Sequence, residues 1–568
     1  MTVRQTCCRF GASRSVFGFA VVAVTAVAIL AGWPAHAASP LSGRDSDPVV
    51  MNGSQLPSFT GLAPESVVGF CYHKGWTQIP IQIDECAVND FGVVYDSIPL
   101  GVTTLGYTDA GTFMGSDPDD GFDDDDELVF MARDTGERAA WSAPDPAGVV
   151  PGTRIEVLIS DPNTSDSGYI YLFETDGSLH PGAGLDYVTY NFVLLSGPYL
   201  TTYNTLSGPN PENSEVITPA YRTHFSDRWI RDELNIFTGG ATGVEILDRH
   251  KNLFAPGNCG RSENTFSAGE GAFFANIDGP VRAIRSYIGA NSGPFTQRDH
   301  FFYADRHDVV TRLRVHAISS VMDFYDYSPA ALGMIYYNDF NTAGVDIDGS
   351  PVETVTPGAI NWEMVTGAQG TLVHIGVLDT DIPGLGYTSY YLDDATPPVT
   401  QCTGDDHAYG SSGLYVDQPI PNTDPGLGPA YRFVMTRTVY VEAPNQPVST
   451  ATTRHAQVAL PLTTTVSPVT AAHSPGVSPP LLLGQNFPNP FSRTTRFVVT
   501  APPGESFTVR IFDVGGKLVK TLIDKAHGQR IIGWDGRDKN GLRVASGIYF
   551  YQFTSKQFTQ TRKMVLVD

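Results

Sequence analysis

The run Arg510-Ile511-Phe512-Asp513-Val514-Gly515-Gly516-Lys517-Leu518-Val519-Lys520-Thr521-Leu522 sets the architecture of the last part of the chain. Its first half alternates as a half-buried strand does, and Gly515-Gly516 can form a hairpin turn before a partner strand. Further on, Asp538-Lys539-Asn540-Gly541 has the residues of a tight turn, and residues 547–553 form an aromatic, alternating strand. The sequence therefore predicts a small antiparallel β-sandwich over residues 481–568.

Four motifs follow one another in this region up to the terminus. They are Gln485-Asn486-Phe487-Pro488-Asn489-Pro490-Phe491, Trp534-Asp535-Gly536-Arg537-Asp538, Ser546-Gly547-Ile548-Tyr549 and Gln560-Thr561-Arg562-Lys563-Met564-Val565-Leu566. With them, residues 481–568 resemble the C-terminal sorting domain of type IX secretion cargo, whose fold is related to the immunoglobulin-like domain of flagellar hook-capping proteins. The resemblance implies an address that the outer-membrane secretion machinery reads, without catalysis of its own. An ordinary immunoglobulin-like module is the alternative.

The other end of the chain has the pattern of a secretory signal peptide. Arg4, Arg9 and Arg14 precede an apolar run from Val16 to Gly32, and Ala35-His36-Ala37 is a small-x-small cleavage pattern. We therefore expect residues 1–37 to be removed. The rest of the sequence contains no second long apolar segment, so we expect no transmembrane span after cleavage. Together the two ends predict a secreted or bacterial cell-surface protein.

The composition favours an all-β, acidic extracellular protein. Without the signal peptide the chain would carry 33 Lys and Arg against 60 Asp and Glu, a net charge of −27. Such acidity excludes nucleic acid as a partner, because binding to phosphates depends on Lys and Arg. It is compatible with cation binding. The 57 Gly and 41 Pro, together with abundant Tyr and Phe, are typical of turn-rich β structure.

The sequence divides the rest of the chain into a body and a linker. Residues 38–60 are polar and predicted to be loose. Residues 61–445 have no low-complexity break, and their length favours one enlarged or two packed β-sandwiches, with a seam near residue 180. The predicted modules are therefore 61–180 and 181–445. Thr, Ser and Pro dominate residues 446–480, which predicts an extended linker.

A dense acidic loop lies in the first of these modules. Residues 117–127 read Asp-Pro-Asp-Asp-Gly-Phe-Asp-Asp-Asp-Asp-Glu, directly before an apolar strand. Carboxylates this close repel one another, and Ca²⁺, which binds six to eight hard oxygen ligands, relieves the repulsion. The sequence predicts a structural Ca²⁺ site, and a solvated acidic loop is the alternative. The predicted ligands are Asp117, Asp119, Asp123, Asp125 and Glu127.

A basic stripe in the second module suggests binding of an acidic polysaccharide. Alternation over residues 311–318 would place Arg312, Arg314 and His316 on one face of a strand. Arg forms bidentate pairs with carboxylates, and aromatic residues nearby could stack on sugar rings. The predicted carbohydrate-binding residues are Arg282, Arg312, Arg314, His316 and Trp362. Ion pairs with the protein's own acids are the alternative.

Four cysteines remain after signal cleavage. An exported protein favours disulfides, and four cysteines allow three pairings. The short separation of Cys71 and Cys86 favours a bridge between them, which leaves Cys259 to pair with Cys402. Free buried thiols are the alternative.

The sequence leaves the activity of the body open. It contains no nucleophile elbow, phosphate loop or dinucleotide fingerprint, so no catalytic residues are assigned and binding is favoured over turnover. We expect a surface-delivered β-sandwich protein whose body binds extracellular material such as carbohydrate. An extracellular polysaccharide hydrolase or lyase and a structural surface-layer component are the alternatives. A deep cleft that joins Arg, His and Tyr would favour the enzyme, whereas a shallow aromatic face would favour binding.

Overall fold

The fold was analysed in a computed structural model of the chain. The structure describes residues 39–568 except residues 91, 94–102, 113, 141, 198–209, 256–259, 270, 290–295, 352–353, 397–401, 422–430, 469–481, 484–485, 487–488, 490, 501–505, 515, 527–528, 556–558 and 568. The predicted signal peptide lies outside these residues. The named strands pair antiparallel throughout, so the all-β prediction is confirmed.

The first module is a β-sandwich whose two sheets enclose an apolar core. One sheet has the order β27-β8-β9-β2-β3 and the other the order β1-β7-β4, and a hairpin of β5 and β6 is added to them. Val67, Leu128, Val157 and Leu172 are among the fully buried residues of the core. The strands of this module are β1 (Pro48–Asn52), β2 (Val67–Tyr72), β3 (Trp76–Ile79), β4 (Gln82–Asp84), β5 (Cys86–Asp90), β6 (Thr103–Tyr107), β7 (Glu127–Met131), β8 (Ile155–Ser160) and β9 (Ser167–Glu174), with β27 (Thr463–Pro468) from far along the chain.

The second module contains a nine-stranded sheet and two four-stranded sheets. The large sheet has the order β15-β16-β17-β18-β26-β23-β22-β20-β21, and the smaller ones are β10-β11-β12-β13 and β14-β19-β25-β24. The strands are β10 (Thr189–Asn191), β11 (Ser214–Ile217), β12 (Tyr221–Asp227), β13 (Ile230–Ile236), β14 (Leu247–Phe254), β15 (Ala272–Asp278), β16 (Ala283–Ile288), β17 (Gln297–Phe302), β18 (Arg306–Arg312), β19 (Val321–Tyr327), β20 (Ile335–Asn338), β21 (Asn341–Asp346), β22 (Glu363–Gly367), β23 (Gly370–Thr380), β24 (Thr388–Asp394), β25 (Ala408–Val416) and β26 (Phe433–Glu442). A short helix, α3 (Glu263–Ser267), precedes β15.

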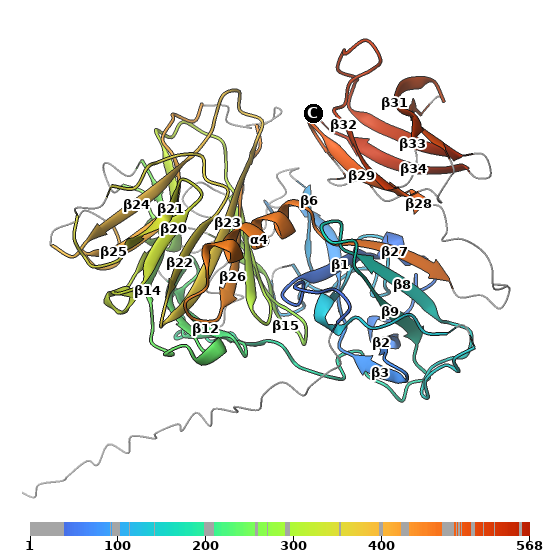
Figure 1. Ribbon diagram of the computed structural model, residues 1–568, viewed down its shortest axis with the longest axis horizontal. Helices are drawn as coiled ribbons and strands as arrows, with labels where there is room; N and C mark the ends of the chain where they lie inside the picture. The colour runs from blue at the N-terminus through green and yellow to red at the C-terminus, as the bar shows by residue number, and fades with distance from the viewer. Residues whose placement is uncertain are drawn as a thin grey trace, which may run out of the picture. The chain divides into compact units, whose positions relative to one another are not determined.

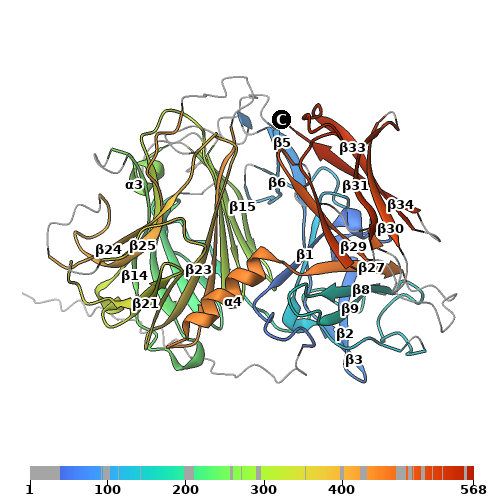
Figure 2. The same cartoon turned by 45° about the horizontal axis from the view of Figure 1, so that its top comes forward.

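The terminal domain is the predicted small sandwich, drawn in orange-red to red in Figures 1 and 2. Its sheets have the orders β28-β29-β32 and β31-β30-β33-β34. Trp534, Tyr551 and Leu566 lie in its core. The Asp538 carboxylate accepts backbone hydrogen bonds from Asn540 and Leu542, which confirms the predicted tight turn. The strands are β28 (Leu482–Leu483), β29 (Thr495–Thr500), β30 (Phe507–Asp513), β31 (Leu518–Ala526), β32 (Gln529–Trp534), β33 (Gly547–Ser555) and β34 (Thr559–Leu566).

The N-terminal part of the body is ordered, and the prediction that residues 38–60 are loose is wrong. Strand β1 pairs with β7 from Pro48↔Met131 to Asn52↔Glu127. Leu41, Met51 and Phe59 are at most 2% exposed in the core of the first module. Scattered apolar residues in a polar stretch suffice to bury one face of an edge strand.

The predicted linker is also structured over most of its length. Helix α4 (Val448–Ala459) packs against β22 and β23, and β27 pairs with β8 from Thr463↔Ser160 to Pro468↔Ile155. Figure 1 shows α4 and β27 following one another in orange. The Thr- and Ser-rich composition that suggested a tether is instead that of an edge strand and a half-buried helix. Residues 469–480, the rest of the predicted linker, lie outside the described residues.

The predicted Cys71–Cys86 disulfide is not formed, because both residues are buried free thiols. Cys71 is on β2, while Cys86 begins β5, which belongs to another sheet. The chain changes sheet after Pro80, so a short separation in sequence does not bring the two thiols together. Cys402 is disulfide-bonded. Its predicted partner, Cys259, lies outside the described residues, and that pairing stays a prediction.

Candidate functional site

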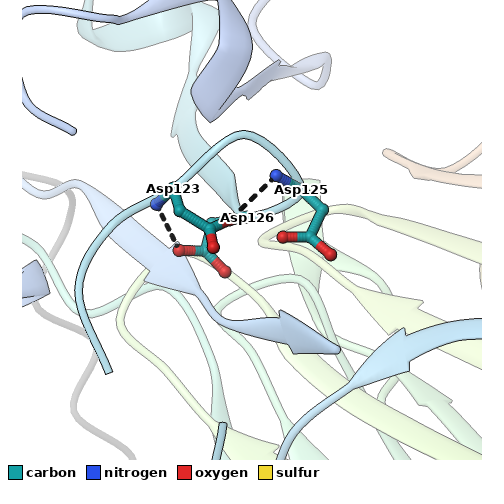
Figure 3. A group of neighbouring side chains, drawn as sticks. All are labelled: Asp123, Asp125 and Asp126. Atoms are coloured by element: carbon teal, nitrogen blue, oxygen red, sulfur yellow. Dashed lines mark hydrogen bonds between the residues drawn. The ribbon is translucent and has the colours of Figure 1, made fainter. Parts of the chain in front are cut away.

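The acidic loop brings together three carboxylates. Carboxylate oxygens of Asp123, Asp125 and Asp126 lie within 4.8 Å of one another. Figure 3 shows them on the concave side of the loop that precedes β7. Two backbone hydrogen bonds shape the loop: Asp123 N donates to Asp126 Oδ2 at 2.9 Å, and Asp125 N donates to Asp123 Oδ1 at 3.0 Å. The loop therefore gathers hard oxygen donors of the kind that Ca²⁺ prefers.

The electrostatics of this loop favour the binding of a cation. Burial, together with the neighbouring Asp123, raises the pKa of Asp125 to about 7. The hydrogen bond with Asp125 lowers the pKa of Asp123. Glu85 lies close enough to Asp126 that burial and this charge raise its pKa to about 7. Burial is the first cause of these raised pKa values and neighbouring carboxylates are the second, so a bound cation would favour the charged forms of these carboxyl groups.

The remaining predicted calcium ligands lie outside the three-carboxylate cluster. Asp119 is exposed, and its backbone N–H donates to Asp117 Oδ1 at 3.0 Å. Glu127 accepts hydrogen bonds from Tyr107 at 2.9 Å and from Arg282 at 2.7 Å, so it already has a counter-charge. Asp126, which the sequence did not single out among four consecutive Asp residues, is fully buried and accepts from Cys86 N at 2.9 Å.

The interior of the second module holds a second concentration of charge. Arg437 on β26 donates to Asp323 Oδ1 at 2.7 Å and to Glu363 Oε1 at 3.2 Å. Asp323 also contacts His250 Nε2 at 3.1 Å. Burial would raise the pKa of Asp323, but His250 and Arg437 lower it well below its ordinary value. Burial raises the pKa of Glu363 to about 7, against the effect of Arg437.

Tyr287, His300 and His307 form a chain in the same interior. Tyr287 OH lies 3.1 Å from His300 Nε2, and His300 Nδ1 lies 3.1 Å from His307 Nε2. Burial lowers the pKa of both histidines well below the ordinary value, so both rings are neutral at pH 7. The three side chains are 0%, 1% and 1% exposed. An Arg/His/Tyr constellation therefore exists, but it is sealed inside the sandwich and a polysaccharide could not reach it.

The structure does not bring the predicted carbohydrate-binding residues together. Arg282 is buried and pairs with Asp84 at 2.8 Å. Trp362 is 5% exposed in the apolar cluster under α4. Arg312 is half-exposed and pairs with Asp299 at 2.5 Å.

Arg314 and His316 lie beyond the end of β18, which stops at Arg312. The predicted strand alternation therefore does not apply to these two residues. His316 Nε2 lies 3.3 Å from Arg261 Nη1. The alternative reading, ion pairs with the protein's own acids, describes Arg282 and Arg312.

The first module carries aromatic rings on the outer face of its five-stranded sheet. Val67 and Cys71 of β2 point into the core, while Phe70 and Tyr72 point to the other side. On that side the Trp76 ring lies 5.0 Å from the rings of Tyr72 and Tyr171 in edge-on contacts. Trp76 Nε1 donates to Pro144 O at 2.6 Å, which fixes the indole.

Charged groups border these rings. Arg138 donates from Nε and Nη2 to the two carboxylate oxygens of Glu156, at 3.1 and 2.8 Å. Its guanidinium lies 5.7 Å from the Tyr169 ring centre, and its side chain is 63% exposed. Tyr72, Trp76 and Tyr169 are half-buried. We call the set Tyr72, Trp76, Tyr169, Arg138 and Glu156 the aromatic face.

Sequence reasoning missed the aromatic face. The signal was present in part, because Tyr72 and Trp76 flank the turn His73-Lys74-Gly75. Tyr169 and Glu156 join them only because β9 pairs with both β2 and β8.

Comparisons with known proteins identify only the terminal domain. The family described as the FlgD Ig-like domain matches residues 489–557. No curated protein matches the chain. In the described part of the chain, no helix has the length and apolarity needed to cross a membrane.

Three solved structures show the range of distant similarity. A putative aldose 1-epimerase from Escherichia coli K12 has 13% identity and a TM-score of 0.24, and covers 45% of this chain and 99% of its own. An alpha-mannosidase from Enterococcus faecalis V583 has 7% identity and a TM-score of 0.34, over 87% of this chain and 54% of its own. Dimeric latent PorU from Porphyromonas gingivalis has 13% identity and a TM-score of 0.15, over 70% of this chain and 35% of its own. At these scores the similarities carry no functional argument.

Proposed function

We propose that this is an exported protein, delivered to the cell surface through its terminal domain, whose body binds extracellular carbohydrate without turning it over. The aromatic face is the observation that carries the proposal. Half-buried rings present apolar surface against which a sugar ring can stack, and they keep polar edges for hydrogen bonds. The bidentate Arg138–Glu156 pair beside them adds directed donors and acceptors.

The interior of the second module supports binding over catalysis. An acid–base pair must reach the bond that it cleaves. Tyr287, His300 and His307, the Arg/His/Tyr-type set of this module, are sealed in the sandwich. The enzyme alternative would need a different set of groups, whereas the aromatic face is open to solvent at Arg138.

A glycan array and a polysaccharide panel, read for retention and for product release, test this proposal on the chain from residue 38 to residue 568. We expect retention without release of reducing ends or unsaturated sugars. Tyr169→Ala should weaken retention about fivefold, as expected for the loss of about 1 kcal/mol of ring contact. Phe340→Ala removes an exposed ring (52%) from the second module and is the matched control. Product release would identify an enzyme, and equal effects of the two variants would move the binding site elsewhere.

Delivery by the terminal domain is tested separately. Removal of residues 481–568 should leave a folded body that is stranded in the periplasm. Efficient surface display of this truncated chain would contradict the role as an address, and would leave the carbohydrate proposal intact.

We also propose that the acidic loop binds a structural Ca²⁺ through Asp123, Asp125 and Asp126. With one oxygen from each, the three carboxylates supply fewer than the six to eight oxygens that Ca²⁺ takes, so backbone carbonyls and water would complete the shell. Asp126 already closes the loop through its hydrogen bonds to Cys86 N and Asp123 N. An ion there would tie the loop to the start of β5.

A further inference from the structure

A groove runs along one edge of the terminal domain. It has a volume of about 450 Å³ and lies against residues of β29, β31 and β32. β31 and β32 are each the last strand of their sheet. The groove therefore lies where the two sheets of the sandwich end, and an end strand can accept a further strand along the part of its edge that is not already paired. On β31 Val519 O already accepts from Lys539 N at 3.0 Å, so a further strand would pair beyond this point, beside Thr521.

The side chains at the groove combine an apolar base with positive charge. Leu522, which is half-buried, supplies the apolar surface, whereas the Trp534 side chain is 1% exposed and its ring packs in the core against Phe491 and Tyr549. Arg496 and Lys520 supply two cations. Asp535 is the acidic residue of the groove lining, and it pairs with Lys520: Lys520 Nζ lies 3.0 Å from Asp535 Oδ1.

The charge of the whole domain reinforces this bias. Residues 481–568 contain 13 Lys and Arg against 6 Asp and Glu, whereas residues 38–480 contain 20 against 54. A net charge of +7 on the terminal domain contrasts with −34 on the rest. Charge of opposite sign steers association and selects among partners.

We propose that this groove is a docking site for an extended acidic peptide strand of a partner protein. The peptide would add to the edge of β31, with its backbone paired to the strand, as peptides do at exposed sheet edges. Alternate acidic side chains would face Arg496 and Lys520, and the apolar ones would rest on Leu522.

Gly533 provides a way to block the groove without unfolding the domain. It lies in β32 and lines the groove. A Cβ added there would meet no atom nearer than 3.7 Å, from Thr495 O. Gly533→Val therefore fills groove space with a residue that strands favour.

Fluorescence anisotropy of a labelled octapeptide of alternating Glu and Val, titrated with the mature chain, tests the proposal. We expect saturable binding that weakens with salt, and no comparable binding of the matching peptide of Lys and Val. Arg496→Gln with Lys520→Gln should weaken binding about fivefold or more, because exposed ion pairs contribute up to about 1 kcal/mol each. Gly533→Val should weaken it at least as much. Arg510→Gln removes an exposed cation of β30 that does not line the groove, and should change binding less than about twofold.

An N-methylated form of the same acidic peptide separates strand addition from charge attraction. It keeps the side chains but lacks the N–H groups needed for pairing, and we expect it to bind at least about fivefold more weakly. Unchanged binding of this peptide would overturn strand addition. No binding of the unmodified peptide, equal loss with Arg510→Gln, or tighter binding of an anionic oligosaccharide would each overturn the proposal.

Discussion

The interior of the second module and the aromatic face of the first module both combine arginine with aromatic rings, yet only one of them is available to a ligand. In the interior, Arg437 lies 5.2 Å from the Tyr325 ring centre and is 5% exposed. On the aromatic face, Arg138 lies 5.7 Å from the Tyr169 ring centre, and its side chain is 63% exposed. The same residue types therefore stabilise a core in one place and form a surface in the other, and burial makes the difference.

The difference has an energetic reason. A buried guanidinium needs carboxylates around it, because desolvation of an unpaired charge costs several kcal/mol. Asp323 and Glu363 meet this need for Arg437. An exposed pair is solvated on its own and can exchange water for a ligand at little cost. Substitutions at the two arginines should therefore separate stability from binding.

The largest expected effect is at Arg437. Arg437→Met should destabilise the protein by about 3 to 5 kcal/mol, since it leaves buried carboxylates without their partner. Urea unfolding, followed by tryptophan fluorescence, measures the change. Arg312→Met removes a half-exposed arginine from the same large sheet and is the control. It should cost about 1 kcal/mol, because the buried Asp299 keeps hydrogen bonds from Ser286 and Gln297. Similar losses in both variants would show that the interior network is not specially stabilising.

The next effect concerns the strand that completes the sheet of the aromatic face. A chain that ends at residue 445 lacks α4 and β27, whereas one that ends at residue 468 keeps them. Arg44 would lose its hydrogen bonds to Leu460 O at 2.7 Å and Gln457 O at 3.1 Å, and β8 would lose its neighbour. We expect the shorter chain to be less stable by at least about 2 kcal/mol, at about 1 kcal/mol for each of the two Arg44 hydrogen bonds.

Hydrogen exchange of β8 amides in the two truncated chains measures this. Faster exchange in the shorter chain alone is the expected result. Equal protection would mean that the first module is complete without the returning strand.

A smaller effect separates two arginines of the first module, Arg138 and Arg154. Arg138→Ala should cost about 1 kcal/mol, because the Arg138 side chain is 63% exposed and the buried Glu156 keeps a hydrogen bond from Tyr171 OH at 3.1 Å. Arg154 lies 5.1 Å from the Trp76 ring centre and donates to Ala143 O at 2.7 Å. Arg154→Ala should cost about 2 kcal/mol. Thermal melts measure the stability of both variants. Arg138→Ala should also be retained less on the glycan that the mature chain binds. Normal retention by that variant would exclude Arg138 from the surface.

The smallest effect is the pH response of the acidic loop. The pKa of Asp125 is about 7 in the folded chain, against an ordinary value of 3.8. The folded state therefore holds a proton that the unfolded state releases, and stability falls as pH rises through this window. With a chelator present, the melting temperature should fall between these pH values, and Ca²⁺ should reduce the fall. Asp125→Asn should remove the Ca²⁺ response and reduce the pH response, to which Glu85 and Glu363 also contribute because their pKa values are about 7. Asp119→Asn should leave both responses unchanged. A melting temperature that does not change on addition of Ca²⁺ would count against the loop as a metal site.

Local sequence patterns predicted much of the strand inventory. The alternation that begins at Arg510 and the aromatic alternation at residues 547–553 correspond to β30 and β33. Alternation failed at residues 311–318, since β18 ends at Arg312 while the apolar and polar residues continue to alternate. Periodicity indicates how a chain could be arranged in a sheet, but the neighbouring strand decides where the sheet ends. Here Leu313 N donates to Phe433 O, where β26 begins.

The candidate sites divide in the same way. The acidic loop was visible because its carboxylates are consecutive, although the roles of Asp126 and Glu127 depended on their partners Cys86 and Arg282. The aromatic face was not visible, because Glu156 and Tyr169 reach Trp76 only through strand pairing.

The sequence by itself determined the strand-rich character of the chain, the fold of its terminal domain and the acidic loop, because each rests on residues close together in the chain. Only the tertiary structure decided which arginines are buried, that Cys71 and Cys86 stay apart, and where the first module ends. Burial and pairing depend on contacts between distant segments, as when β27 joins β8 across some three hundred residues. Local periodicity carries no information about those partners, since it is the same for a strand whose polar face meets water and for one whose polar face meets buried acids.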